Sequence, residues 1–163
     1  MRRVLAGLLA CMMMGTACAE QQMQETTHAS DRYVSVVTTT LIPGGNGDVE
    51  RISASTSALD GLYAGQTLTL SQLLGMEQQE GESIAATLAY ALVWQQIEAQ
   101  SEAYLENLTP DDLRLAFQPE TDFYLDMDGN VVFFIQQGEI AGEVAGILRF
   151  PFSQAELMAS LAE

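Results

Sequence analysis

The stretch FYLDMDGNVVFFI, residues 123–135, consists of two strongly apolar runs separated by a short polar segment. Both runs are rich in aromatic and β-branched residues, which favour β-strands. Asp128-Gly129 between the runs tolerates the positive φ angles that a tight turn requires. The stretch therefore predicts a β-hairpin from local sequence signals alone.

The same acidic residues also suggest a calcium loop of the EF-hand type. Counted from Asp126, the residues Asp128 and Asn130 occupy ligand positions of such a loop. The sixth position needs glycine for a sharp turn and is Val131, and the twelfth needs a bidentate glutamate and is Gln137. We therefore expect a hairpin turn here and no metal site.

The remaining pattern predicts strands on both sides of a long helix. The expected elements are strands at 33–42, 49–57 and 67–70, a helical turn capped by Ser71, a long helix at about 80–105, a short helix after Thr109, a strand at 147–150 and a helix after Ser153. The apolar face of the long helix is expected at Ile84, Leu88, Ala91, Leu92 and Ile97. This order predicts an α+β fold, with a mainly antiparallel sheet of four to five strands and one long helix packed on it.

Residues 1–19 have the organisation of an export signal, with a basic start, an apolar run and a small-residue exit. The apolar run is about a dozen residues, shorter than the roughly 20 that a membrane-spanning helix needs. Two outcomes stay open: cleavage after Ala19, as in a secretory signal, or lipid attachment at Cys18, as in a lipoprotein signal. Either outcome predicts an extracytoplasmic protein, secreted or lipid-anchored at the cell surface, that meets the membrane only through a lipid.

Two regions are expected after this signal. Residues 20–31 are polar and without period, which is typical of a flexible tether. Residues 32–163 are expected to form one domain. Both cysteines, Cys11 and Cys18, lie in the signal, so this domain has no disulfide and must depend on a packed core.

The chain is strongly acidic, with 22 acidic and 6 basic residues, a formal net charge of −16 and no lysine. Removal of residues 1–19, which contain Arg2 and Arg3 and no acidic residue, would leave 4 basic against 22 acidic residues, a net charge of −18. Such a surface repels nucleic acid and anionic lipid headgroups and attracts cationic proteins. The alternative is that the charge only keeps an exported protein soluble.

Few residues of the chain suit catalysis. The only histidine, His28, lies in the predicted tether, so the domain has no base for a Ser-His-Asp mechanism and no His-Cys zinc site. Two pairs of carboxylates, Asp111 with Asp112 and Asp126 with Asp128, are of the type that hydrolyses glycosides. A helix start and a turn already explain these pairs, so we expect a protein that is not an enzyme and needs no cofactor.

An acidic stripe is expected along the long helix. Glu98, Glu102 and Glu106 are spaced by four residues, which places them on one helical face. Like charges at this spacing destabilise a helix by a few tenths of a kcal/mol per pair. We interpret the stripe, extended by Asp111 and Asp112, as a binding face for a cationic partner. The alternative is a solvated face on a protein that is acidic throughout.

The C-terminal part carries an ordered set of motifs that resembles a known family. These motifs are Phe123-Tyr124, Asp128-Gly129, Val132-Phe133-Phe134, Glu139-Ile140-Ala141, Gly146 and Phe150-Pro151-Phe152. In this order they resemble the C-terminal domain of RsiV-type proteins, the domain of unknown function DUF3298. Residues 33–45 and 60–75 resemble the family's first strand and the segment before its long helix. The chain departs from the family's frequent residues at Asn46-Gly47, Gln137-Gly138 and Gly142.

The resemblance implies a function outside the cytoplasm. Relatives include anti-sigma factors that sense lysozyme, and polysaccharide deacetylases in which the domain is an accessory. It implies a non-enzymatic binding module of the bacterial cell envelope, whose partner would be lysozyme or another cationic protein. Two alternatives stay open. One is an accessory domain that contacts cell-wall glycan, the carbohydrate of peptidoglycan, through exposed aromatic residues such as Trp94 or Tyr124. The other is a carboxylate-dependent hydrolase.

Overall fold

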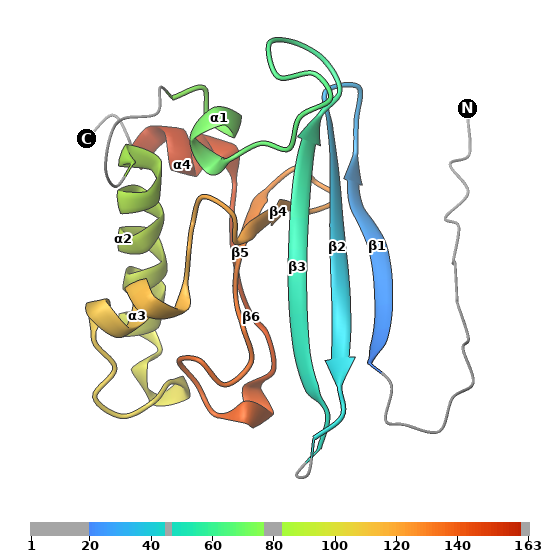
Figure 1. Cartoon of the computed structure of the whole chain (residues 1–163). Helices are drawn as coiled ribbons and strands as arrows, with labels where there is room; N and C mark the ends of the chain where they lie inside the picture. The colour runs from blue at the N-terminus through green and yellow to red at the C-terminus, as the bar shows by residue number, and fades with distance from the viewer. Residues whose placement is uncertain (1–19, 45–46, 77–82, 161–163) are drawn as a thin grey trace.

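The computed structural model describes residues 20–44, 47–76 and 83–160, which form three stacked layers (Figure 1). The elements are β1 (Gln21–Ala29), β2 (Tyr33–Ile42), β3 (Val49–Ala58), α1 (Leu70–Leu73), α2 (Ile84–Ala99), η1 (Ser101–Ala103), α3 (Pro110–Ala116), β4 (Phe123–Leu125), β5 (Val131–Ile135), η2 (Glu143–Ala145), β6 (Leu148–Phe152) and α4 (Gln154–Ser160). One layer is the antiparallel sheet β1-β2-β3, and the next is the antiparallel sheet β4-β5-β6. Helices cover the side of the second sheet that faces away from the first (Figure 1).

The α+β class is confirmed, but the predicted single sheet of four to five strands with one long helix is wrong. The described residues form two three-stranded sheets, and several short helices accompany α2. The reason lies in β5, whose side chains are buried on both faces of its sheet. Val131, Phe133 and Ile135 pack with the helices, whereas Val132 and Phe134 pack against the first sheet. A strand covered on both faces has a continuous apolar sequence, as VVFFI does.

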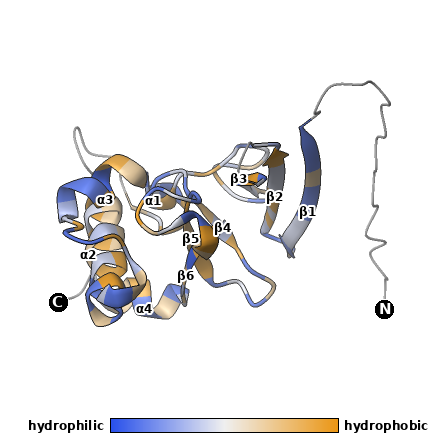
Figure 2. Ribbon diagram, turned by 90° about the horizontal axis from the view of Figure 1, so that it is seen from below, coloured by the Kyte–Doolittle hydropathy of each residue, from blue (hydrophilic) through white to orange (hydrophobic). Residues whose placement is uncertain are grey.

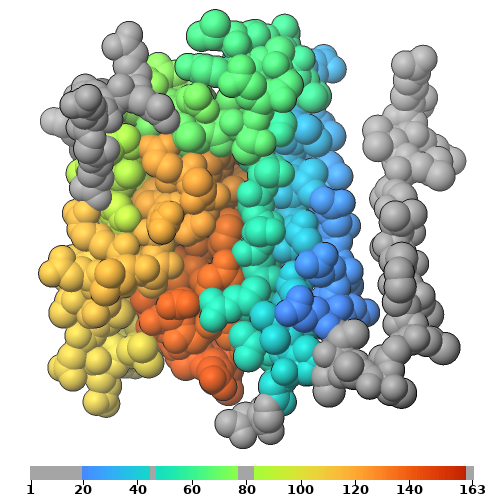
Figure 3. All heavy atoms as spheres, viewed as in Figure 1, coloured from blue at the N-terminus to red at the C-terminus, as the bar shows by residue number. Residues whose placement is uncertain are grey.

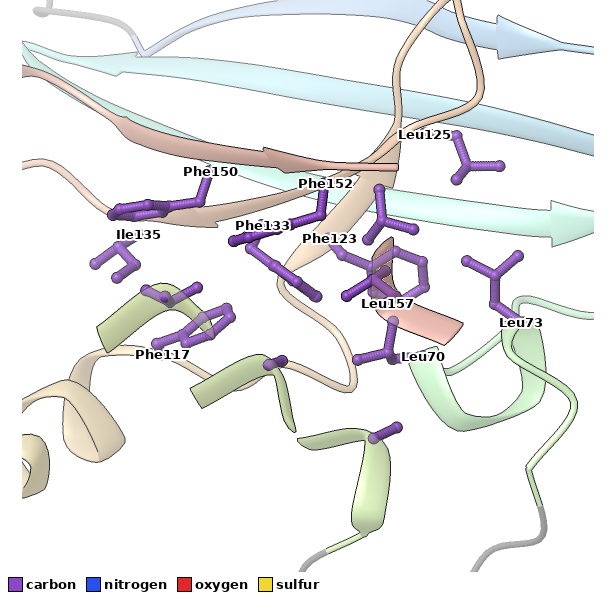
Figure 4. Close-up of a cluster of buried hydrophobic side chains, with 14 of the residues drawn as sticks. Leu70, Leu73, Phe117, Phe123, Leu125, Phe133, Ile135, Phe150, Phe152 and Leu157 are labelled. Carbon is purple, nitrogen blue, oxygen red and sulfur yellow. The ribbon is translucent and has the colours of Figure 1, made fainter. Parts of the chain in front are cut away.

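The larger core lies between the second sheet and the helices (Figure 4). Phe117, which follows α3, packs edge-on against Phe133 of β5, with ring centroids 5.6 Å apart. Tyr90 of α2 packs edge-on against Phe117 at 5.7 Å, and its hydroxyl donates a hydrogen bond to the Phe117 carbonyl at 2.8 Å. Aromatic pairs of this geometry favour one packing arrangement over others. These contacts fix α2 and α3 relative to the hairpin.

The smaller core joins the two sheets to each other. Its members are Val37, Ile52, Tyr124, Val132, Phe134 and Ile147. At its side the buried hydroxyl of Ser35 in β2 accepts a hydrogen bond from the Leu125 amide of β4 at 2.9 Å. The Ser35 hydroxyl also lies 2.6 Å from the Thr56 hydroxyl. This pair satisfies polar groups in an interior where an unpaired group would cost about 1–3 kcal/mol.

The predicted flexible tether at residues 20–31 is wrong, because most of this segment is strand β1. The strand pairs with β2 from Gln21 opposite Leu41 to Ala29 opposite Val34. Its residues are mostly polar (Figure 2). Most of them are also exposed, so the strand shows no alternating pattern of burial. Backbone pairing, which any side chain permits, holds the strand in place. His28 reaches the second layer, where its Nδ1 lies 2.9 Å from the Asp126 carbonyl oxygen.

The hairpin predicted at residues 123–135 is confirmed. β4 and β5 pair antiparallel, with Phe123 opposite Phe133. The carboxylate of Asp126 accepts hydrogen bonds from the amides of Asp128 and Asn130, each at 2.9 Å, and Gly129 has the positive φ of 81° that the turn needs. The Asp126 carboxylate thus stabilises the turn as a hydrogen-bond acceptor.

Most of the other predicted elements are confirmed, some with shifted ends. Strands 33–42 and 49–57 correspond to β2 and β3, and strand 147–150 corresponds to β6. Capping boxes start α3 at Thr109 with Asp112 and precede α4 at Ser153 with Glu156. The predicted strand at 67–70 is wrong: only Thr67 forms a bridge, to Ser57, and the turn α1 is capped by Thr69 instead of Ser71.

α2 is shorter than the predicted helix at 80–105, and it turns a different face to the core. Its N-cap is Ser83, and residues 77–82 lie outside the described part of the chain. Ala85, Ala89, Val93 and Ile97 form its buried stripe. The predicted face was wrong at Ile84 and Ala91, which are exposed. Alanine is weakly hydrophobic, but its small side chain allows the helix backbone to approach the aromatic strands closely.

Candidate functional site

The candidate site lies where α2 ends and the chain turns back towards the second sheet. Residues 99–108 contain no glycine or proline, yet the α-helix ends at Ala99 and a 3₁₀ turn follows. Two effects oppose a longer helix. Glu98 and Glu102 place negative charge at the negative end of the helix dipole, and no basic residue in the last turn of α2 compensates. Packing of the following loop then redirects the chain.

That loop is held by its backbone. The Leu105 amide donates a hydrogen bond to the carbonyl of the buried Ile140 at 3.0 Å, which attaches the loop to the segment after β5. The Leu108 amide donates to the Leu105 carbonyl at 3.3 Å and closes a turn. Within the turn Asn107 has a φ of 61°, a conformation that asparagine tolerates better than most residues. Glu106 is thereby fixed at an exposed position of the turn.

Helix and loop together enclose a pocket of about 300 Å³. Its lining residues are Trp94, Ile97, Glu98, Ser101, Tyr104, Leu105, Glu106, Asn107 and Leu108. Figure 3 shows the loop segment, in yellow, at the surface on the side of the molecule opposite β1. The volume is at the lower end of the range for pockets that hold small ligands. The pocket therefore suits one side chain or one sugar unit better than an extended polymer.

The pocket combines aromatic rings with two carboxylates. Trp94 and Tyr104 are half-buried, and Glu98 and Glu106 are exposed. Burial raises the pKa of the Tyr104 hydroxyl, so the ring stays neutral. Among the described residues each arginine has a contact elsewhere: Arg32 with Tyr33, Arg51 with Glu139, Arg114 with Tyr90 and Arg149 with the Ile147 carbonyl. No basic residue is among the residues that line the pocket.

The predicted acidic stripe is only partly brought together. Glu98 and Glu106 line the same pocket, but Glu102 lies in η1 and does not line it. A single helical stripe was wrong, because α2 ends before Glu102. Asp111 is exposed in the first turn of α3. Asp112 is engaged by Thr109, whose hydroxyl and amide hydrogen bonds lower the pKa of Asp112.

The aromatic residues proposed for glycan contact have different positions. Trp94 lines the pocket, whereas Tyr124 is buried between the two sheets, so its expected exposure was wrong. Tyr104 and Leu105 were missed because the predicted helix extended to about residue 105, and Asn107 was missed because it lies just after that end. Their signal in the sequence was weak: an asparagine that tolerates a positive φ, inside a segment with good helix formers.

In each carboxylate pair considered for a hydrolase, at least one carboxylate already forms hydrogen bonds within the local structure. Asp112 caps α3. Burial by itself would raise the pKa of Asp126, but hydrogen bonds from Asn130, Asp128 and Gly129 outweigh burial, and the pKa is lowered. Within the described ranges no three histidine, cysteine, aspartate or glutamate side chains gather as metal ligands would.

Another carboxylate, Glu120, joins the two ends of the segment that leads from α1 to α2. It accepts hydrogen bonds from the Ser71 amide at 3.0 Å, from the Ser71 hydroxyl at 2.5 Å and from the Ser83 hydroxyl. Burial opposes ionisation of Glu120, but these hydrogen bonds outweigh it and lower the pKa. Because Ser83 is the N-cap of α2, Glu120 positions the start of the helix whose other end forms the pocket.

The predictions for residues 1–19, including cleavage after Ala19 and lipid attachment at Cys18, fall outside the described part of the chain. In the part that is described, no helix has the length and apolar character needed to cross a membrane.

No curated protein matches the chain. Residues 79–155, from just before α2 into α4, match a family model described as "Protein of unknown function (DUF3298)". The upstream resemblance at residues 33–45 and 60–75 lies outside this match. The match confirms the resemblance to DUF3298 seen in the sequence over residues 79–155.

Proposed function

We propose that this protein is a non-enzymatic binding module of the bacterial cell envelope, exported through residues 1–19, that captures a basic protein. Lysozyme is the first candidate partner, because the family resemblance includes proteins that sense it. The observation that carries the proposal is the pocket at the end of α2, where Glu98 and Glu106 lie beside Trp94 and Tyr104 with no basic residue in the lining.

The charge of the whole chain supports this proposal. A net charge of −16 accelerates the encounter with a basic protein at low salt. Charge alone gives little specificity, since exposed ion pairs contribute about 0–1 kcal/mol each. Specificity has to come from a shaped site, and the pocket supplies one. Binding is favoured over hydrolysis because Asp112 and Asp126 already act as acceptors for a helix cap and a turn.

Charge reversal near the pocket tests the proposal. The triple variant Glu98→Lys, Glu102→Lys, Glu106→Lys should weaken lysozyme binding at least tenfold, because it replaces attraction by repulsion at the site. A matched control reverses three exposed acidic residues elsewhere, Glu25→Lys, Asp48→Lys and Glu143→Lys. The control changes the net charge equally and should weaken binding less. Equal loss of affinity in the two triples, measured by calorimetry, would remove this face as the site.

A second candidate function, contact with cell-wall glycan, is favoured by one observation, the position of Trp94 in the pocket. Aromatic side chains offer a flat apolar surface for ligands, and a pocket of this volume fits one sugar unit. Binding to isolated peptidoglycan that is insensitive to salt and is lost in Trp94→Ala would favour this function over capture of a basic protein.

A further inference from the structure

We infer that the pocket holds the guanidinium group of a single arginine side chain that projects from the basic partner. This inference rests on the proposed function and specifies the chemistry of contact. In this inference the pocket binds one side chain of the partner, and the remaining acidic surface only attracts the partner by its charge. Three properties of the pocket carry it: its aromatic residues, its two glutamates and its position at a helix end.

The aromatic lining suits a planar cation. Trp94 lines the pocket from α2 and Tyr104 lines it from the loop after η1, so aromatic residues contribute from two segments. A guanidinium group stacks on aromatic faces, and tryptophan is the strongest partner for such cation–π contacts. The chain already contains one such contact. The guanidinium carbon of Arg114 in α3 lies 4.7 Å from the ring centroid of Tyr90, which is in α2, the helix that carries Trp94.

The charges of the pocket suit a cation with several hydrogen-bond donors. Glu98 comes from the last turn of α2, and Glu106 comes from the turn closed by Leu105 and Leu108. The carbonyl groups at the end of α2 add the negative end of the helix dipole on the same side. Carboxylates on two segments can each accept hydrogen bonds from one guanidinium, whose five donors lie in a plane.

These same properties favour arginine over lysine. An ammonium group is compact and strongly hydrated, and it loses more of its hydration when it enters a pocket lined by Trp94, Ile97 and Leu108. Guanidinium is more weakly hydrated and stacks on a ring with its apolar face. The pocket should therefore discriminate between the two cations, which a charged surface without shape would not do.

The chain contains a built-in reporter for this inference, because Trp94 is its only tryptophan. Acetyl-arginine amide is added to the full-length chain while tryptophan fluorescence is recorded. Acetyl-lysine amide and an N-acetylglucosamine oligomer are tested in parallel at equal ionic strength. We expect a saturable change with the arginine compound and a response to the lysine compound that is weaker by roughly two- to fivefold in affinity.

Two double variants separate pocket charge from total charge. Glu98→Gln with Glu106→Gln removes the two carboxylates of the pocket, and we expect arginine affinity to fall by roughly three- to tenfold. Glu102→Gln with Asp111→Asn removes two nearby charges that do not line the pocket, and affinity should stay within about twofold. Circular dichroism verifies that both variants keep the fold.

Three outcomes would overturn the inference: equal responses to arginine and lysine, equal losses in the two double variants, or a saturable response to the sugar oligomer alone. The proposed function fails by a different result, which is the absence of binding between the full-length chain and a basic protein. If a basic protein that lacks tryptophan binds while Trp94 fluorescence stays unchanged, capture of the protein stands and the arginine pocket is wrong.

Discussion

At the scale of single residues, a few polar side chains decide how the layers fit together. Ser35 lies within a run of threonines and valines and has the sequence context of an exposed strand position. In the structure Ser35 is completely buried, and its hydroxyl accepts a hydrogen bond from the Leu125 amide. Such a partner belongs to another layer of the fold, so no local pattern predicts it. The cap of α3 at Thr109 could be predicted, because donor and acceptor are only three residues apart.

Glu120 is the residue whose ionisation should matter most directly for stability. We expect Glu120→Gln to lower the free energy of unfolding by about 1–3 kcal/mol near neutral pH, because it weakens hydrogen bonds from Ser71 and Ser83 to a charged acceptor. Urea unfolding measures this difference. Glu143→Gln, at an exposed glutamate, is the control and should change stability little.

The effect of Glu120→Gln should also depend on pH. Folding lowers the pKa of Glu120 below its ordinary value of 4.5, so the ionised form stabilises the folded state above that pH. This contribution is lost as the pH falls through the lowered pKa. The stability difference between the wild type and the variant should therefore be full at pH 7 and shrink in acid. Burial raises the pKa of Asp122 and acts in the opposite direction, but Asp122 is present in both proteins and cancels in the difference. A difference that is the same at pH 7 and about pH 3 would contradict this account.

At the scale of elements, the two edges of the first sheet are treated differently. The β3 edge is covered: the Gln136 side chain accepts a hydrogen bond from the Ile52 amide at 3.0 Å and donates to the Ile52 carbonyl at 2.7 Å. Gln137 accepts from the Glu50 amide at 2.6 Å. Side-chain amides thus replace a neighbouring strand and protect an edge that would otherwise be open to pairing with another chain. The β1 edge has a polar, exposed sequence, which limits such pairing by another means.

Strand β1 is the element on which sequence and structure differ most, and hydrogen exchange tests it. Because β1 pairs with β2 along its length, amides of both strands should exchange slowly, and those of β2 should be the more protected. Deletion of residues 20–29 should leave the second sheet protected and expose amides of β2. Rapid exchange throughout residues 21–29 in the full-length chain would mean that the segment is a tether after all.

At the scale of the whole molecule, the sequence could predict most elements but not their layering. The hairpin at residues 123–135 was predictable because Asp-Gly between apolar runs is a local signal. That β5 is covered on both faces depends on which side chains reach it from the first sheet and which from the helices. The pocket was only half predictable. Glu98 and Glu106 could be picked out by their charge. Tyr104 and Asn107 line the pocket because the helix ends at Ala99, and the loop that follows is held by a long-range contact between Leu105 and Ile140.

The most direct test of the central claim is binding of the full-length chain to lysozyme across a salt series. An unrelated protein of equal net positive charge is measured in parallel. We expect lysozyme binding to persist at physiological salt, where the Debye length is about 8 Å, because contacts in a shaped site are screened less than general attraction. Binding of the unrelated protein should be lost there. Equal affinities for the two proteins that fall together with added salt would contradict the account and leave the acidic surface with no selective partner.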